Sequence, residues 1–587
     1  MRVSFAAVAF ALLVTRPLPA AEGPQLPGTQ PLTLAGDIAS QLVDGVDRFL
    51  LREIETSQAA GESLWRRDFS SPEAYRNSIA AQRARLARFL GLRDSRPKFA
   101  GFERLDTVRN AGPAARSETY EIFPIRWRAF GDVYARGLLL KPTSDPPKAF
   151  VVALPDADVS PEQLVGLAPG VPEASQYARR LAEAGCYVVV PTLIDRMPGD
   201  RRCPHGDRKV VLTTREFLYR SAFELGRHPL GYELQMVFGA LDGFDDEAAS
   251  QSLTVPYGVF GWGEGGLVAM YAAALDERIA ATVVSGAFDD RREMWKAPLD
   301  RNVFGLLTQF GDADTASMIL PRALIVEAAV GPQVVVAPGG AGGPGSLATP
   351  PVERVRSEFA RLQKLGSKLG REGNPLLVES DNGAGPYASE ATRHAFAKAL
   401  GIGGPIASKP DEIEVLRSDL DVDVRRKELT HEIVRHHELL LRESPYVRQE
   451  FMKRLNTSSI PAYNESARPY RDYFYNEVMG RFSHSLLPPN PRSRIAFESE
   501  TCIAYEVTLD VFPDVIAYGV LLTPKGLKTD ERRPVVVCQH GLEGRPMDVI
   551  AGDHYAYHDY ATKLAERGFV VFAPQNLYLF RDRFRTL

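Results

Sequence analysis

At 587 residues the chain is too long for one small module, and at roughly 100 to 200 residues per domain it should hold two or three cores. Its 44% hydrophobic and 25% charged residues are typical of a globular protein, which excludes disorder, collagen and a coiled coil as descriptions of the whole. The 70 basic and 74 acidic residues give a net charge of -4, so neither nucleic acid nor an anionic membrane is an expected partner.

The first residues of the chain, 1–21, predict a cleavable signal peptide. Arg2 supplies a positive charge, residues 3–14 form an apolar stretch, and Ala20 and Ala21 end the segment with small side chains. An uncleaved anchor is the alternative, but this stretch is well short of the roughly 20 apolar residues that span a bilayer. We therefore expect a secreted or periplasmic protein without stable membrane association.

An internal repeat dominates the organisation of the chain. Residues 177–191 (YARRLAEAGCYVVVP) match residues 560–574 (YATKLAERGFVVFAP) without a gap. Shorter blocks agree in the same order, such as GLLLKP with GVLLTP and FLLRE with LLLRE. Several ordered matches at slowly drifting offsets predict a duplicated unit.

The repeat divides the chain into two copies. Copy one has a helical lead-in at 34–110 and a sheet domain at 111–402, and we expect residues 34–402 to fold alone. Copy two has a helical lead-in at 410–490 and the amino-terminal half of a second sheet domain at 491–587. Near-continuous apolar strands alternate with helices, which predicts an α/β fold with a mostly parallel sheet and helices on both faces.

A glycine-rich turn follows one of these strands and opens an apolar helix. It reads Gly261-Trp262-Gly263-Glu264-Gly265-Gly266, the context of a nucleophile elbow, in which a sharp turn lifts one side chain above the sheet. Here the chain resembles the α/β-hydrolase superfamily, especially secreted dienelactone-hydrolase-like and acetyl-xylan-esterase-like proteins. The resemblance covers about 115–402 and again about 500–587. It implies a serine at position 263, so copy one is a degenerate hydrolase domain.

The same turn also satisfies the GxGxxG pattern of a dinucleotide-binding loop. In that alternative the start of the helix would receive a pyrophosphate, and Asp289 or Asp290 would bind the ribose. Such a loop usually follows the first strand of its domain, whereas several strands precede this one. Glycines that only permit close packing of helix on strand are the third interpretation.

The remaining triad positions of copy one are also incomplete. The resemblance implies the chain order nucleophile, acid, histidine, which places Glu327 at the position of the acid. Where the catalytic histidine is expected, after the strand that ends near residue 380, the chain has Asp381-Asn382-Gly383. The next histidine, His394, fits the surface of a helix better than a displaced base.

Copy two keeps a motif that copy one lacks. Its apolar strand runs into His540-Gly541-Leu542, which resembles the oxyanion loop of the family, where a backbone N–H stabilises the charged oxygen of an acyl-transfer intermediate. Copy one has Pro155-Asp156 at the corresponding place. We expect His540 to hold the loop, because the resemblance implies that the catalytic base comes last in the chain. The second elbow, acid and base would then all lie beyond Leu587, so we expect the chain to be a fragment of a longer protein.

One further motif resembles a metal site. His431-Glu432 and the following residues look like the zinc-binding HExxH helix, but the i+4 position is Arg435. The four cysteines are too few and too scattered for a disulfide framework or a zinc knuckle. No metal or organic cofactor is therefore expected.

Together these observations predict a secreted tandem α/β-hydrolase protein. By resemblance, its intact form is an esterase that uses a serine on acetyl or related carboxylic esters of a small molecule or carbohydrate. The chain itself is expected to be catalytically incomplete. The alternatives are a non-catalytic carbohydrate- or peptide-binding pseudo-hydrolase and a dinucleotide-binding protein.

Overall fold

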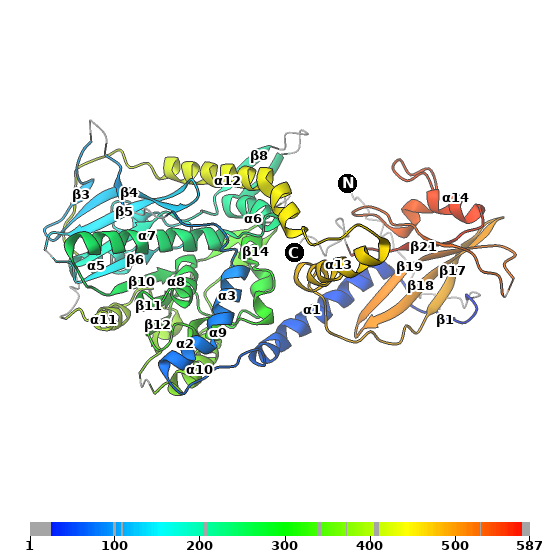
Figure 1. The fold of residues 1–587 in the computed structure, drawn as a ribbon, viewed down its shortest axis with the longest axis horizontal. Helices are drawn as coiled ribbons and strands as arrows, with labels where there is room; N and C mark the ends of the chain where they lie inside the picture. The colour runs from blue at the N-terminus through cyan, green and yellow to red at the C-terminus, as the bar shows by residue number, and fades with distance from the viewer. Residues whose placement is uncertain are drawn as a thin grey trace, which may run out of the picture. The chain divides into compact units, whose positions relative to one another are not determined.

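A computed structural model describes residues 25–577 except 98–100, 107–109, 145, 203–208, 338–341, 371–372, 404–409 and 529. The expected signal peptide and Cys203 lie outside the described residues. The chain separates into two compact units, one built from the residues up to Glu53 together with those from Arg481 onward, and one from Ile54–Gly480. Figure 1 shows the elements of both.

The larger unit is built on one long sheet. Its strands follow the order β15-β12-β11-β10-β6-β7-β5-β4-β3-β16, with β2 paired to β4. The parallel part comprises β6 (Ala149–Leu154), β7 (Cys186–Pro191), β10 (Tyr257–Trp262), β11 (Ile279–Ser285), β12 (Ala323–Ala328) and β15 (Leu376–Glu379). The antiparallel part comprises β2 (Glu103–Arg104), β3 (Ala115–Arg116), β4 (Tyr120–Phe130), β5 (Val133–Pro142) and β16 (Glu414–Val415).

Helices cover both faces of this sheet, as the sequence predicts. Alternate side chains of β6 enter opposite cores: Phe150, Val152 and Leu154 pack on one side, and Val151 and Ala153 on the other. This period of two on a strand buried on both faces explains its continuous apolar sequence. The first face packs against α7 and α8 and the second against α5 and α11. The architecture fits an α/β-hydrolase-like fold.

The helices and short turns of the larger unit have these bounds. The α-helices are α2 (Pro72–Ser78), α3 (Ala80–Phe89), α4 (Pro161–Leu164), α5 (Tyr177–Glu183), α6 (Thr214–Glu224), α7 (Pro229–Gln251), α8 (Glu264–Leu275), α9 (Asp312–Ser317), α10 (Val352–Ser367), α11 (Glu390–Ala399), α12 (Val422–Phe451) and α13 (Ile460–Tyr473). Short 3₁₀ turns include Met294–Lys296, Leu299–Arg301 and Asp381–Gly383. Two hairpins stand apart from the sheet: β8 (Pro198–Arg202) with β9 (Lys209–Thr213), and β13 (Val334–Val336) with β14 (Gly345–Leu347).

The smaller unit contains a second sheet with the order β1-β17-β18-β19-β21-β20. Its strands are β1 (Gln30–Pro31), β17 (Arg492–Glu498), β18 (Cys502–Phe512), β19 (Val515–Pro524), β20 (Val535–Val537) and β21 (Val570–Pro574). α14 (Tyr560–Glu566) covers β21. β20 and β21 are parallel, as are β6 and β7 of the larger unit.

The lead-in before the second sheet packs on the first sheet. α12 lies against β5 and α6, with Leu429 and Ile433 buried in the core of the larger unit. The guanidinium of Arg136 on β5 lies 2.7 Å from Glu432 and 2.9 Å from Glu428 of this helix. β16, which precedes α12, extends the sheet by pairing with β3.

The first part of the lead-in before the first sheet, residues 25–53, packs on the second sheet, whereas its helices α2 and α3 pack in the core of the larger unit. β1 pairs with β17, and the first turns of α1 (Ile38–Glu62) place Leu42 and Val43 against Ile516 and Tyr518 of β19. The rings of Phe49 and Phe512 stack with centroids 5.2 Å apart. Residue 54 onward of α1 belongs to the larger unit.

The structural division therefore differs from the copies expected at 34–402 and 410–587. The repeat identifies equivalent segments, but it does not indicate which sheet each segment packs on. Pairing with the distant sheet moves 25–53 into the smaller unit and 410–451 into the larger one. No described helix is long and apolar enough to cross a bilayer.

This division argues against the expectation that residues 34–402 fold alone. That fragment lacks α12, so the apolar surface beneath Leu429 and Ile433 would be exposed to solvent. We predict that a 54–480 fragment is monodisperse and unfolds cooperatively in urea, whereas 34–402 aggregates. Size-exclusion chromatography with light scattering compares the two, and a monodisperse, cooperatively folded 34–402 fragment would contradict the prediction.

A buried histidine gives the docking of α12 a pH dependence. His437 contacts the Tyr232 hydroxyl at 2.7 Å and Ser221 at 2.9 Å, and burial together with neighbouring His436 lowers its pKa to about 4. The ring stays neutral in the fold but protonates below about pH 6.5 when unfolded, so stability falls as pH drops from 6.5 to 4.

We predict that His437→Gln removes a pH-dependent loss of up to about 3 kcal/mol from the free energy of unfolding over this window. Urea unfolding at pH 7, 5.5 and 4 measures it. His394→Gln is the control, because that side chain is 38% exposed and approaches only Glu390 among the described residues. Equal pH slopes for the His437→Gln variant and the unmodified protein would refute the assignment.

Candidate functional site

The predicted elbow lies where β10 turns into α8. Gly263 has φ 60° and ψ -122°, a backbone conformation that strains any residue with a side chain and that is found at sharp strand-to-helix turns. Its N–H donates to the Ser285 carbonyl oxygen at the end of β11. The turn of a nucleophile elbow is therefore present, and the residue at its tip has no nucleophilic atom.

The space above this tip is already occupied. A Cβ at position 263 would lie 2.6 Å from the Asp156 carboxylate and 3.1 Å from Pro332. Pro332 belongs to the glycine- and proline-rich segment 331–346, which includes β13 and the start of β14. A side chain at the tip would have to displace the carboxylate or the proline.

The backbone N–H that follows the tip is also occupied. In a serine hydrolase of this type the N–H after the nucleophile helps to stabilise the oxyanion. Here the Glu264 N–H donates to Asp156 Oδ1 at 2.9 Å. The carboxylate of Asp156 thus lies where the negatively charged oxygen of an acyl intermediate would have to lie.

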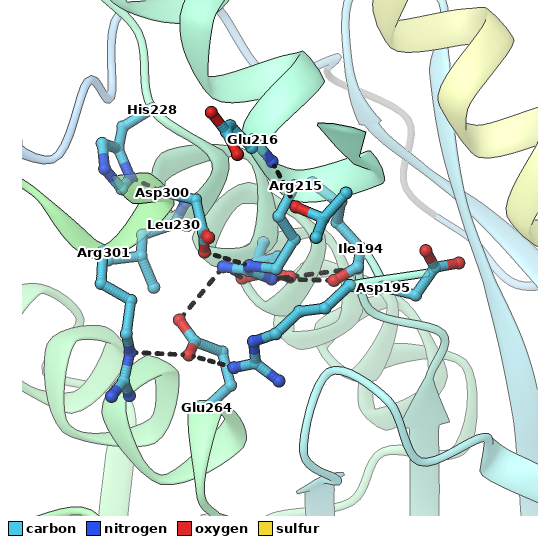
Figure 2. Close-up of polar contacts among 12 residues, drawn as sticks. Ile194, Asp195, Arg215, Glu216, His228, Leu230, Glu264, Asp300 and Arg301 are labelled. Atoms are coloured by element: carbon cyan, nitrogen blue, oxygen red, sulfur yellow. Dashed lines mark hydrogen bonds and ion pairs between the residues drawn. The ribbon is translucent and has the colours of Figure 1, made fainter. Parts of the chain in front are cut away.

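Asp156 belongs to a buried network of charges at the carboxyl ends of the parallel strands, part of which Figure 2 shows. Arg196 lies 2.9 Å from Asp156 and 2.8 Å from Glu264, and Arg301 Nε lies 3.0 Å from Glu264. Arg215 lies 3.1 Å from Glu264, 2.6 Å from Glu233 and 2.9 Å from Asp300. The network joins the loop after β6, the loop after β7, helices α6, α7 and α8, and the turn at 299–301.

Glu264 is the centre of this network because it touches all three arginines. Its side chain is fully buried, and burial alone would raise its pKa. Arg301, Arg215 and Arg196 outweigh burial and hold the pKa of Glu264 well below its usual range. A carboxylate that stays ionised in this position supports structure, since it cannot exchange a proton near neutral pH.

The expected acid, Glu327, is placed at the end of β12 and is buried. Its carboxylate accepts from the backbone N–H groups of Ala388 and Ser389 and from the Thr392 hydroxyl, and it contacts the Ser285 hydroxyl. These contacts fix the start of α11. Its hydrogen-bonding capacity is used without a histidine.

The expected histidine loop after β15 holds no histidine close to the elbow. Asn382 adopts φ 51° and its side-chain oxygen accepts from Arg356. His394 lies on α11, side chain partly exposed, 3.9 Å from Glu390. The structure therefore brings the elbow glycine and the acid to one end of the sheet, and neither the loop at 381–383 nor His394 supplies a base there.

The same geometry argues against the dinucleotide-loop alternative. A pyrophosphate at the start of α8 would compete with Asp156 for the Glu264 N–H and would meet the Glu264 carboxylate nearby. Asp289 and Asp290, the candidate ribose ligands, pair with Arg354 at 2.5 and 3.9 Å. These groups are occupied by protein contacts.

The oxyanion-loop candidates lie in the smaller unit, after β20. His540 is buried, and its Nδ1 lies 2.9 Å from the Gly541 carbonyl oxygen. The Gly541 N–H donates to the Tyr557 hydroxyl, and Leu542 is 75% exposed. Gly541 occupies the position that corresponds to Asp156, so no carboxylate is attached to this loop at that point.

Two histidines of the HExxH-like segment, His436 and His437, contact protein groups, whereas His431 is exposed. Glu432 pairs with Arg136, His436 lies 3.2 Å from Asp94, and His437 contacts Tyr232. Among the residues that the structure describes, no group of three or more His, Cys, Asp and Glu side chains could hold a metal ion. Cys186, Cys502 and Cys538 are buried free thiols.

Sequence reasoning missed Asp156 as a site residue, although it had compared the Pro155-Asp156 pair with His540-Gly541. A carboxylate directly after a buried strand, where the related loop has glycine, was the available signal. The arginines Arg196, Arg215 and Arg301 are separated along the chain and form no motif, so only the fold brings them together.

Comparison with known proteins finds no matching family model and no matching curated protein. Solved structures with a similar fold include a putative acetyl xylan esterase from Bacteroides fragilis, 14% identical, with a TM-score of 0.40 over 61% of this chain and 89% of that one. A glucuronoyl esterase from Solibacter usitatus is 13% identical, with a TM-score of 0.33 over 51% and 83%. An acylaminoacyl peptidase from Pyrococcus horikoshii is 13% identical, with a TM-score of 0.30 over 49% and 41%.

Identities and TM-scores of this size describe the architecture and carry no information on what this chain acts on. The chemistry of the site depends on its own residues.

The buried network predicts that replacing Glu264 by an uncharged residue strongly lowers the free energy of unfolding. Glu264→Gln removes a charge that faces three arginines, and an uncompensated buried charge costs about 3–5 kcal/mol of folding free energy. The control Glu353→Gln removes an acid that is 77% exposed and should cost less than about 0.5 kcal/mol. Urea unfolding of both variants tests this, and similar losses would show that the network does not stabilise the fold.

Proposed function

We propose that residues 54–480 form a pseudo-hydrolase, a non-catalytic α/β-hydrolase-like unit that binds a small molecule or carbohydrate at its former active site. One observation carries the proposal: the elbow tip is Gly263, and the Glu264 N–H beside it is bonded by Asp156. Nucleophile and oxyanion stabilisation are both missing at one place, and these are separate requirements for acyl transfer.

We propose that this unit keeps a ligand-binding site although it has lost catalysis. Residues at the former catalytic positions now hold the structure: Glu327, at the position of the acid, fixes α11, and Asp156, at the position of the oxyanion loop, joins the buried charges. A cavity remains beside Gly263, lined by residues after β10 and β11 and by the 331–351 segment. Pockets at this end of an open parallel sheet are where α/β proteins bind ligands.

The smaller unit is proposed to be the beginning of a second, esterase-like copy of the same fold in a secreted protein. The repeated blocks support this, as does the parallel pairing of β20 with β21, which matches β6 with β7. Gly541 in place of Asp156 leaves its loop without the carboxylate that blocks the first elbow.

Substitution at the elbow tests the pseudo-hydrolase proposal. We predict that Gly263→Ser in the full-length chain gives no hydrolysis of p-nitrophenyl acetate above the unmodified chain and no stoichiometric labelling by a fluorophosphonate probe. The serine would meet Asp156 and Pro332 and would lack a base, so restoring one member of a triad recovers little. The strained backbone should also cost about 1–3 kcal/mol of stability.

The double variant Asp156→Gly, Gly263→Ser is the matched comparison, because it also removes the carboxylate from the elbow. It should remain inactive, since no described histidine lies in the loop at 381–383. Turnover well above background in either variant would mean that a base reaches the elbow, and the proposal would be wrong.

A further inference from the structure

A cavity of about 210 Å³ lies beside Gly263. Residues between Gly286 and Arg301 line one part of it, and Pro332 together with residues 346–351 lines another. Its apolar lining includes Leu230, Leu267, Tyr271, Ala287, Met294 and Leu347. For comparison, an apolar cavity of about 150 Å³ is large enough to hold benzene. The cavity therefore suits a small organic molecule.

The basic side chains around this cavity differ in how they are paired. Arg291 is held by Asp312 at 2.7 Å, and it also donates to the Ala287 carbonyl oxygen. Arg354 is held by Asp289 and Glu293 at 2.5 and 2.7 Å. Lys296 pairs with Glu293 and is half exposed. Their positive charges are balanced by carboxylates of the protein.

Arg301 is paired on one side only. Its Nε faces Glu264, and in Figure 2 its two outer nitrogens turn away from that carboxylate. No residue in the described part of the chain accepts a hydrogen bond from these two Nη groups. The side chain is nevertheless only 12% exposed and lines the cavity. Because these Nη groups have no acceptor in the described structure, a ligand in the cavity that accepts from them gains charge-assisted hydrogen bonds.

The ligand that these donors fit is a carboxylate. The two Nη groups form a planar fork that matches the two oxygens of a carboxylate, with two parallel hydrogen bonds. Glu264, Asp289 and Glu293 already balance the neighbouring positive charges, so little net positive charge remains for a second negative charge on the ligand. A monoanion is therefore preferred over a phosphate dianion, and the apolar walls favour a hydrocarbon or aromatic body.

We propose that this cavity binds a small organic monocarboxylate, with its carboxylate on the Arg301 Nη groups and its apolar part against Leu267, Tyr271 and Leu347. The inference rests on the proposed pseudo-hydrolase function and gives the chemical class of its ligand. A monocarboxylate is also the acid product of ester hydrolysis, so the unit would retain recognition of a product after losing the reaction.

Benzoate is the probe for this site, and benzamide is its neutral counterpart of nearly the same shape. We predict saturable binding of benzoate to the full-length chain by isothermal titration calorimetry, and at least about tenfold weaker binding of benzamide. The comparison uses the unmodified protein, so it does not depend on how a variant folds. Equal affinity for the two molecules, or no benzoate binding, would overturn the proposal.

Arg301→Lys assigns the binding to this side chain. Lysine keeps a cation opposite Glu264 but lacks the planar fork, so benzoate should bind at least about tenfold more weakly. Arg442→Gln, at a position that is 74% exposed on α12, should leave the affinity unchanged. Unchanged benzoate affinity in Arg301→Lys would place the binding elsewhere and refute the site. Ester turnover measured on the same samples tests the pseudo-hydrolase proposal separately.

Discussion

The hydrogen bond from the Glu264 N–H to Asp156 is the interaction on which the rest of the site depends. It places a buried carboxylate directly beside the elbow, and a buried carboxylate must be compensated. Arg196 compensates it, Glu264 in turn faces Arg196, Arg215 and Arg301, and Glu233 and Asp300 complete the charges around Arg215. A chain of paired charges thus extends from the elbow to three helices. The loss of the serine and the presence of this network form one consistent arrangement, because a side chain at position 263 would collide with its first member.

Much of the fold of the larger unit follows from the sequence, and the reason is burial. Strands such as β6 and β7 are covered on both faces, so their continuous apolar residues identify them directly. The elbow was also predictable, since glycines at 261, 263, 265 and 266 stand where a strand meets a helix. Gly263 alone indicates that copy one lacks a nucleophile, because glycine has no side-chain atom that could attack a carbonyl carbon.

The rest could not be predicted for two different physical reasons. The residues of the charge network are irregularly spaced along the chain. They form no sequence motif, so their association could not be predicted from the sequence. Arg301, for example, becomes notable only because its outer nitrogens have no acceptor in the described structure. The exchange of the lead-ins was hidden for the opposite reason. The repeat shows that the two lead-ins are equivalent in sequence. It does not indicate which of the two sheets each lead-in packs on.

The pairing of β1 with β17 has a consequence for how the protein is made. Thr29 and Ser493, whose hydroxyls lie 2.7 Å apart, are 464 positions apart in the chain. At about 5–20 residues per second on the ribosome, the first segment exists for roughly 20–90 seconds before its partner strand has been synthesised. During that time Leu42, Val43 and Phe49 have no surface of their own to cover them. The smaller unit must therefore fold after nearly the whole chain has emerged, whereas residues 54–480 can close as soon as α12 is complete.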